Sequence, residues 1–168
     1  MIYYILISLL ILFIFFILYI FILMKKINKL EKIILIKFKE KNNQITSLYE
    51  CTKPYLNKHN EIFKEALILK QKDFSENLFF NNLLEKSKTY KLIHNEFNFI
   101  FRVCNKHPKI NKDSKFLLIK DTVIDKSNEL WKKLILYKQI TDTYNKYITI
   151  KNITIIWIFI PIPKINNL

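Results

Sequence analysis

Histidine is the residue of this chain best suited to proton transfer or metal binding, and its three copies are far apart in the sequence. His59, His94 and His107 lie in separate segments, and none has a second ligand four residues on or an HExxH context. The run His59-Asn60-Glu61 holds a base and an acid, but adjacent residues on a helix do not face each other. We therefore predict no metal site and interpret each histidine as solvated or at a helix end.

Nucleophilic and cofactor chemistry also lacks a framework in the sequence. The serines have no glycine elbow, because the chain contains no glycine at all. Glycine-rich phosphate loops of the P-loop or Rossmann type are excluded for the same reason. Cys51 and Cys104 occupy apolar positions of helical patterns, which predicts buried thiols and no disulfide framework. We predict a protein that is not an enzyme and that binds no cofactor.

The elements of the chain begin with an apolar segment, residues 1–24. It contains no charged residue, and Ser8 is its only strongly polar side chain. A helix of about 20 apolar residues crosses a bilayer core of about 30 Å. The start carries no positive charge and the run from Phe21 to Lys26 has no small-residue cleavage site, which favours an anchor over a signal peptide. The sequence predicts a single-pass protein of the cell membrane.

Every charged residue follows Met24, so residues 25–168 carry the whole net charge of +14. The lysines are densest directly after the anchor, where Lys25, Lys26, Lys29 and Lys32 form what we name the lysine collar. Because positive flanks stay on the cytoplasmic side, we predict a short outside N-terminus and a cytoplasmic body. The collar would also attract anionic headgroups of the bilayer, at about 1 kcal/mol for each lysine near the surface.

After the anchor, apolar residues recur at spacings of three and four, which is the period of a helix. A first run consists of Ile27, Leu30, Ile34, Phe38, Ile45 and Leu48, with a lapse at residues 41–43. A second run is a heptad seam typical of coiled coils, interrupted only by Lys86: Phe79, Leu83, Lys86, Tyr90, Ile93, Phe97, Ile100 and Cys104. A third consists of Phe116, Ile119, Val123, Ser127, Leu130, Leu134, Tyr137, Thr141, Tyr144 and Ile148. We predict an all-α fold in which a transmembrane helix precedes an antiparallel bundle of long helices.

Prolines and a capping residue divide these helices. Pro54 ends or kinks the first soluble helix: a reversal there gives four soluble helices, and a kink gives three longer ones. Pro108 ends the heptad helix, since the residue before a proline is disfavoured in helical geometry. Asp113 or Ser114 can cap the next helix. The predicted domains are the anchor at 1–24, the bundle at 25–148 and an apolar tail at 149–168.

The tail is apolar from Ile153 to Pro163, but it is about half as long as a membrane span. Trp157 and Phe159 suit an interfacial position, because aromatic side chains gather at the boundary between membrane and water. Docking on the bundle, binding of a partner and a buried strand are the alternatives.

The positive charge raises the question of a nucleic-acid partner, because lysines neutralise phosphates. Arg102 is the only arginine of the chain, and arginine is the residue that reads guanine or phosphate in a bidentate manner. Lysines spread along a chain more often form a solvated face. The composition argues against nucleic acid as the partner.

From residue 100 onward the chain resembles the LemA family of bacterial membrane proteins. The family's stretch close to L-L-x-V-x-E-x-Y-P is matched by residues 100–108, and its x-L-x-x-N-x-x-F-L-x-L-Q by residues 109–120, with the asparagine one place early. Its T-E-N-x-I and Y-N-x-x-V-x-x-Y-N are echoed at residues 127–130 and 137–145, and the spacing between the motifs fits without a gap. The resemblance implies a membrane-anchored helical bundle with no established catalytic activity. It marks as structural residues Pro108, Asn111, Phe116, Leu117, Tyr137, Tyr144 and Asn145.

The leading functional hypothesis is a non-enzymatic scaffold or adaptor, tethered to the lipid bilayer, that contacts other membrane or envelope proteins or further copies of itself. A stalk-like structural subunit of a larger membrane complex is the first alternative. A binder of anionic lipid or nucleic acid is the second.

Overall fold

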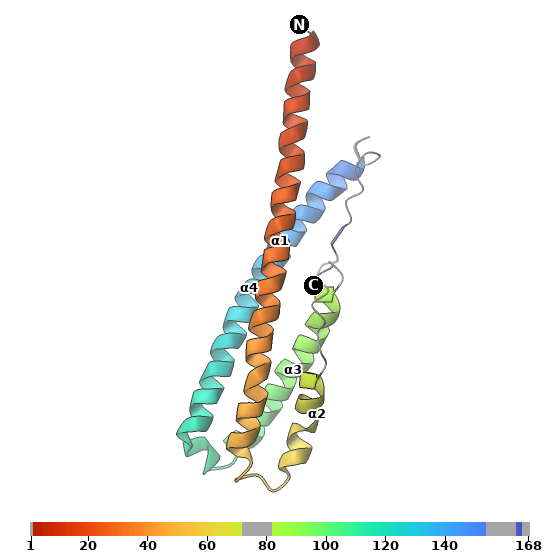
Figure 1. Cartoon of the computed structure of the whole chain (residues 1–168). Coiled ribbons are helices and arrows are strands. Elements are labelled where there is room, and N and C mark those ends of the chain that lie inside the picture. The colour runs from red at the N-terminus through yellow and green to blue at the C-terminus, as the bar shows by residue number, and fades with distance from the viewer. Residues whose placement is uncertain (1, 72–81, 154–163, 166–168) are drawn as a thin grey trace.

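The computed structural model describes residues 2–71, 82–153 and 164–165 of the chain. Within these ranges all regular structure is helical (Figure 1). The α-helices are α1 at Ile2–Thr52, α2 at His59–Gln71, α3 at Asn82–Asn105 and α4 at Ser114–Ile153. A short 3₁₀ helix, η1 at Ile110–Lys112, lies between α3 and α4. The prediction of an all-α fold with a long apolar N-terminal helix is confirmed.

Helix α1 is one unbroken element of 51 residues, about 75 Å long at the rise of an α-helix. No glycine or proline interrupts it, so the apolar segment and the first part of the bundle form a single rod, as predicted. The helix ends at Thr52, whose hydroxyl donates to the carbonyl of Leu48 at 2.8 Å. Pro54 follows in the turn and cannot continue the hydrogen-bond ladder.

The chain reverses direction at Pro54, which is one of the two predicted alternatives. Helices α1 and α3 run one way and α2 and α4 the other (Figure 1). Nε2 of His59, the first residue of α2, lies 2.8 Å from the carbonyl oxygen of Tyr49. Because a carbonyl only accepts, the imidazole donates there, and this bond adds to the one that the same carbonyl accepts from the N–H of Lys53 at 3.1 Å. The hydroxyl of Tyr49 in turn donates to Asn60 at 2.8 Å, so two side-chain contacts tie the reversal together.

The connection from α3 to α4 is organised by Asp113. Its Oδ1 accepts hydrogen bonds from the backbone N–H groups of Lys115 at 2.8 Å and Phe116 at 3.2 Å. Asp113 is therefore the N-cap of α4, one of the two residues predicted for that role. Its Oδ2 accepts from the hydroxyl of Tyr55 at 3.0 Å, which joins the two turns at the same end of the bundle (Figure 1). The hydrogen bond from the N–H of Phe116 is the largest cause that lowers the pKa of the Asp113 carboxyl, and the hydrogen bond from the Tyr55 hydroxyl is the second.

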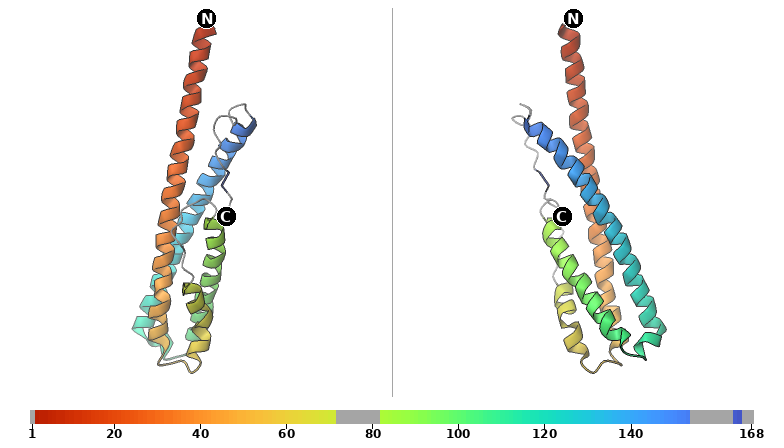
Figure 2. Two further views of the ribbon diagram at one scale, coloured as in Figure 1. Left: turned by 45° about the vertical axis from the view of Figure 1, so that its right-hand side comes forward. Right: turned by 180° about the vertical axis from the view of Figure 1, so that it is seen from behind.

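Helix α1 is the central element of the bundle. Helix α4 packs along it, and α2 and α3 pack against each other and against α1 (Figure 2). Each fully buried large aliphatic or aromatic side chain contributes about 1.5–3 kcal/mol. The core contains most of the predicted seams: Ile27, Leu30, Ile34, Phe38, Ile45 and Leu48 on α1, Tyr90, Ile93, Phe97, Ile100 and Cys104 on α3, and Phe116, Val123, Leu130, Tyr137, Thr141, Tyr144 and Ile148 on α4.

Some details differ from the predicted pattern. Cys104 is buried, but Cys51 is half-buried, because it lies at the edge of the core near the end of α1. On α4 the seam positions Ile119, Ser127 and Leu134 are half-buried. Helix α4 also continues to Ile153, past the predicted end of the bundle at residue 148.

Candidate functional site

The first candidate surface is the N-terminal part of α1, which projects beyond the rest of the bundle in every view (Figures 1 and 2). Among the described helices, α1 alone is long and apolar enough to cross a membrane. Only 6% of its most apolar 18-residue stretch is buried inside the protein, which is unlike the core helix of a soluble protein. The lysines of the collar directly follow this segment, and all of them are exposed: Lys25, Lys26, Lys29 and Lys32.

The bundle begins to cover α1 before the predicted end of the anchor. Ile20 and Leu23 are buried. The ring of Tyr147 on α4 packs edge-on against Phe16 and Tyr19, with ring centroids 5.9 Å and 5.1 Å apart. The part of α4 around Tyr147 therefore lies against the last turns of the apolar segment, and the two units overlap along α1.

A second feature is the contact between α4 and the end of the chain. The side-chain amide of Asn145 donates to the carbonyl of Ile165 at 2.7 Å and accepts from its N–H at 3.0 Å. Ile165 is buried, so this part of the predicted tail docks on the bundle. Trp157 and Phe159, the predicted interfacial residues, lie outside the described residues.

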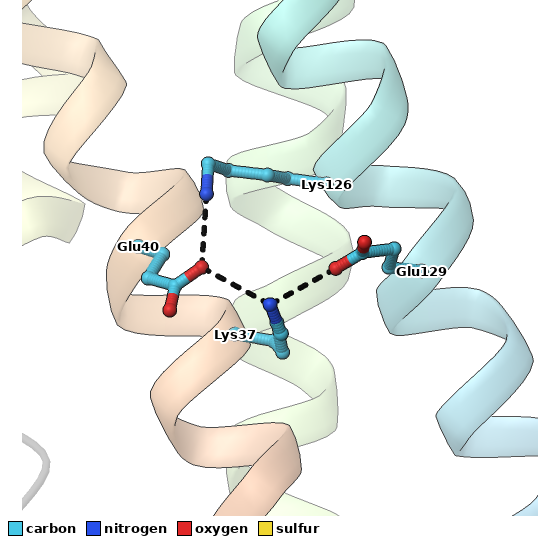
Figure 3. Close-up of polar contacts among 4 residues, drawn as sticks. All are labelled: Lys37, Glu40, Lys126 and Glu129. Carbon is cyan, nitrogen blue, oxygen red and sulfur yellow. Dashed lines mark hydrogen bonds and ion pairs between the residues drawn. The ribbon is translucent and has the colours of Figure 1, made fainter.

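Ion pairs join α1 to α4 in the middle of the bundle (Figure 3). The Nζ of Lys126 lies 2.9 Å from Glu40, and the Nζ of Lys37 lies 3.0 Å from Glu129 and 3.4 Å from Glu40. The hydrogen bond from Lys126 lowers the pKa of Glu40, and the bond to Glu129 raises the pKa of Lys37. Because positive and negative side chains alternate across this contact, the ion pairs favour one register of α4 relative to α1. Each pair is partly exposed and adds little to the stability of the fold.

Helix α4 carries a second apolar face besides the one packed on α1. We name it the outer stripe: Leu117, Ile124, Trp131 and Ile135, which recur at spacings of seven and four. All of them are exposed, and Trp131 retains 65% of its accessible surface. Large exposed aromatic side chains are enriched where proteins bind other proteins.

Between α3 and α4 lies a groove with a volume of about 470 Å³. Phe97, Phe101, Val123 and Ile124 form its apolar part. His94, Arg102 and Lys120 also line it, and none of its described lining residues is acidic.

A buried lysine stands behind the wall of this groove. Lys41 of α1 is only 3% exposed, and its Nζ lies 3.3 Å from Nδ1 of His94 and 5.5 Å from the ring centre of Phe97. Burial lowers the pKa of Lys41 to about 8. Desolvation, and then the charge of Lys41, lowers the pKa of His94. Amine and imidazole therefore share a hydrogen bond in which either group can carry the proton.

The histidines have different structural roles. His59 caps the end of α1, His94 lines the groove, and His107 packs beside Tyr55, with ring centroids 6.2 Å apart. Within residues 2–71 and 82–153, no three His, Cys, Asp or Glu side chains gather in a way that could hold a metal ion.

The residues marked by the family resemblance fall into several environments. Phe116, Tyr137 and Tyr144 are buried in the core. Pro108 and Asn111 are exposed in the turn that precedes α4. Leu117 belongs to the outer stripe, and Asn145 holds Ile165. They are brought together by α4 and its preceding turn rather than by a common pocket.

Comparison of the chain with models of protein families, with curated proteins and with solved structures finds no match. A functional proposal therefore rests on the geometry described above and on the sequence patterns.

The sequence patterns did not predict that two charged side chains are buried. Glu31 and Lys41 lie among the lysines and glutamates that follow the anchor, yet both are buried on the inner face of α1. For Lys41 a signal exists: it stands three residues after Phe38 and four before Ile45, at the expected spacing of a seam position. At Lys41 the apolar seam of α1 therefore does not lapse, as the sequence pattern predicted, but continues through a buried charged residue.

Proposed function

We propose that this protein is a single-pass membrane protein that presents a helical bundle to other membrane or envelope proteins as a scaffold or adaptor. The observation that carries the proposal is the projecting part of α1, an uncharged and exposed apolar helix. In water such a surface would cost about 25 cal/mol for each Å². In a bilayer the same surface is solvated by lipid, and the helix satisfies its own backbone hydrogen bonds.

The proposed placement puts the N-terminus outside and the bundle in the cytoplasm. The lysine collar supports this orientation, because basic flanks stay on the cytoplasmic side. The resemblance of residues 100–145 to the LemA family supports a membrane-anchored bundle of this kind. No charged group stands in the projecting segment, which suits a simple tether rather than a transport path.

The tether is tested by extracting membranes with alkaline carbonate, which removes peripheral proteins and leaves integral ones in the pellet. The informative variant is Leu10→Lys with Ile14→Lys, since each lysine near the bilayer centre costs about 2.5–3.5 kcal/mol. Leu118→Lys, on the exposed surface of α4, is the matched control. We expect the unaltered protein and the control to stay in the pellet and the double variant to be released. Release of the unaltered protein would contradict the tether.

The adaptor role is tested by photo-crosslinking inside membranes. A photoreactive residue at Trp131 probes the outer stripe, and one at Lys64, exposed on α2, serves as the control. We expect partner adducts from position 131 and few from position 64. Recovery of the uncrosslinked protein alone from both positions, with no self-association, would contradict the role.

A stalk in a larger complex is the second candidate, favoured by the unbroken length of α1. The mass of the detergent-solubilised assembly separates the two proposals. A stable complex of defined stoichiometry supports the stalk, whereas crosslinked partners that dissociate on solubilisation support the adaptor.

A further inference from the structure

Lys41 is a buried amine in the core for which the described part of the chain provides no counter-ion. It occupies a seam position of α1 and is 3% exposed. Among the described residues no carboxylate lies within ion-pair distance of its Nζ, whose polar neighbour is His94 at 3.3 Å. Removing an ammonium from water costs several kcal/mol when no opposite charge compensates it. A bound anion would supply that missing charge.

The groove between α3 and α4 adjoins this cation. His94 and Phe97, the two side chains that Lys41 contacts, both line the groove. Further along the groove, Arg102 and Lys120 add two more cations. Lys120 donates to Asn105 at 3.3 Å and Arg102 donates through Nε to the carbonyl of Asn98 at 3.4 Å, so in the described residues both are held by neutral acceptors. The ionisable side chains that line the groove are thus all basic, which favours a negatively charged ligand.

We propose that this groove binds a small organic anion, consisting of a carboxylate or phosphate group attached to an apolar or aromatic body. The anionic group lies against His94 with Lys41 behind it. The body lies on Phe101, Val123 and Ile124. The binding site goes beyond the proposed adaptor function and does not depend on it.

The hydrogen bonds of His94 suit this ligand. When Lys41 is an ammonium, it donates to Nδ1, and the protonated Nε2 of His94 donates to the anion. Nδ2 of Asn98 lies 3.2 Å from Nε2. In this protonation state both nitrogens are donors and cannot bond each other, so an anion at this point would accept from both. Charge-assisted hydrogen bonds of this kind are about twice as strong as neutral ones.

The size and position of the groove favour a small molecule over a lipid headgroup. Its volume of about 470 Å³ lies in the range of small-molecule sites, about 300–1,000 Å³. Lys41 follows Ile20 by 21 residues on the continuous helix α1, so the groove lies roughly 30 Å along the axis from the overlap with the apolar segment. Lipids of the surrounding bilayer do not reach that far.

The test uses the full chain in nanodiscs of zwitterionic phosphatidylcholine, with the imidazole resonances of the three histidines as the readout. Four probes are titrated at constant ionic strength: benzoate, its neutral analogue benzamide, phenyl phosphate and inorganic phosphate. We expect benzoate or phenyl phosphate to shift the His94 resonances saturably and to raise the pKa of His94. The tighter of the two identifies the anionic group. We expect at least tenfold weaker binding of benzamide and of inorganic phosphate.

Variants locate the site. Lys41→Met should lower the affinity for the tighter-binding probe at least tenfold. Lys120→Met, on the protein surface, should lower the same affinity several-fold. Lys64→Met, on the exposed face of α2, should leave it unchanged. A melting curve establishes that each variant is folded. The proposal is overturned if no probe shifts His94 saturably, if benzamide binds as well as benzoate, if inorganic phosphate binds as well as phenyl phosphate, or if all three variants bind alike.

Discussion

The side chain of Asn145 brackets the backbone of Ile165. Its Nδ2 donates to the carbonyl at 2.7 Å and its Oδ1 accepts from the N–H at 3.0 Å. The amide thus forms the paired hydrogen bonds that a neighbouring strand would provide, but it does so from a helix. This clamp, together with burial of the Ile165 side chain, holds the end of the chain against the bundle.

Replacing Asn145 by alanine should loosen this clamp. Each net hydrogen bond contributes about 1 kcal/mol, so the Ile165 amide should exchange its hydrogen about five times faster or more. Amide hydrogen exchange measures the effect, with Asn128→Ala on the exposed surface of α4 as the control. Equal protection of Ile165 in both variants would show that the clamp does not hold the tail.

Lys41 should destabilise the fold when no ligand is bound. Its folded-state pKa of about 8 lies below the ordinary value of 10.5, so folding disfavours the ammonium. Lys41→Met should therefore raise the free energy of unfolding by about 1–3 kcal/mol at neutral pH. Chemical denaturation of the detergent-solubilised chain measures it. A destabilised Lys41→Met protein would contradict this account.

The same residue predicts a pH dependence. Between pH 8 and 10.5 the unfolded chain holds the Lys41 proton and the folded chain does not, so stability rises with pH in that window. Burial raises the pKa of Tyr90 above its ordinary 10.0, which reverses the trend once unfolded tyrosines ionise. Denaturation series from pH 7 to pH 10 should show the rise in the unaltered protein and a flatter profile in Lys41→Met. Parallel profiles would contradict the assignment to Lys41.

Asp113 should stabilise the start of α4 in its ionised form. Since hydrogen bonds from Phe116 and Tyr55 lower its pKa below the ordinary 3.8, this contribution is present above that pH and is lost as the pH falls through the folded-state pKa. Asp113→Ala should lower the melting temperature by a few degrees at neutral pH. Asp113→Asn keeps a capping oxygen and should lower it less. An Asn variant as unstable as the Ala variant would assign the effect to charge alone.

The Glu40–Lys126 pair should contribute to register more than to stability. A double-mutant cycle with Glu40→Gln and Lys126→Met should give a coupling of about 0.2–1 kcal/mol, because both side chains are partly solvated. The coupling should fall with added salt. A salt-independent coupling of several kcal/mol would show that the pair is effectively buried.

Periodic features of this fold could be predicted from the sequence, because apolar spacing reports directly on which face of a helix is buried. Most of the seam residues that the structure describes are buried as predicted, whereas Ile119, Ser127 and Leu134 are half-buried. The Asp113 cap and the helix end before Pro108 follow from local chemistry. Phe79, and the side chain of Leu83, lie outside what the structure describes.

Tertiary contacts could not be predicted in this way. The reversal at Pro54 depends on the contact of His59 with the end of α1, which joins residues ten positions apart. The environment of Lys41 depends on His94, 53 residues away, and the Asn145 clamp on Ile165, 20 residues away. A lysine between apolar residues is conspicuous in the sequence, but its partner and its groove exist only once α1, α3 and α4 are assembled.

The central claim is that α1 crosses the bilayer and continues without a break into the bundle. A nitroxide scan along α1 in nanodiscs tests it most directly, in a Cys51→Ala, Cys104→Ala background so that each label is unique. Collision rates with lipid-soluble oxygen and with a water-soluble nickel complex should place the greatest depth near Leu12 and return to water by the lysine collar, with labels at Leu30 and Ile34 shielded from both agents by the bundle. Free access of the nickel complex to labels from Ile5 to Leu18 would contradict the claim.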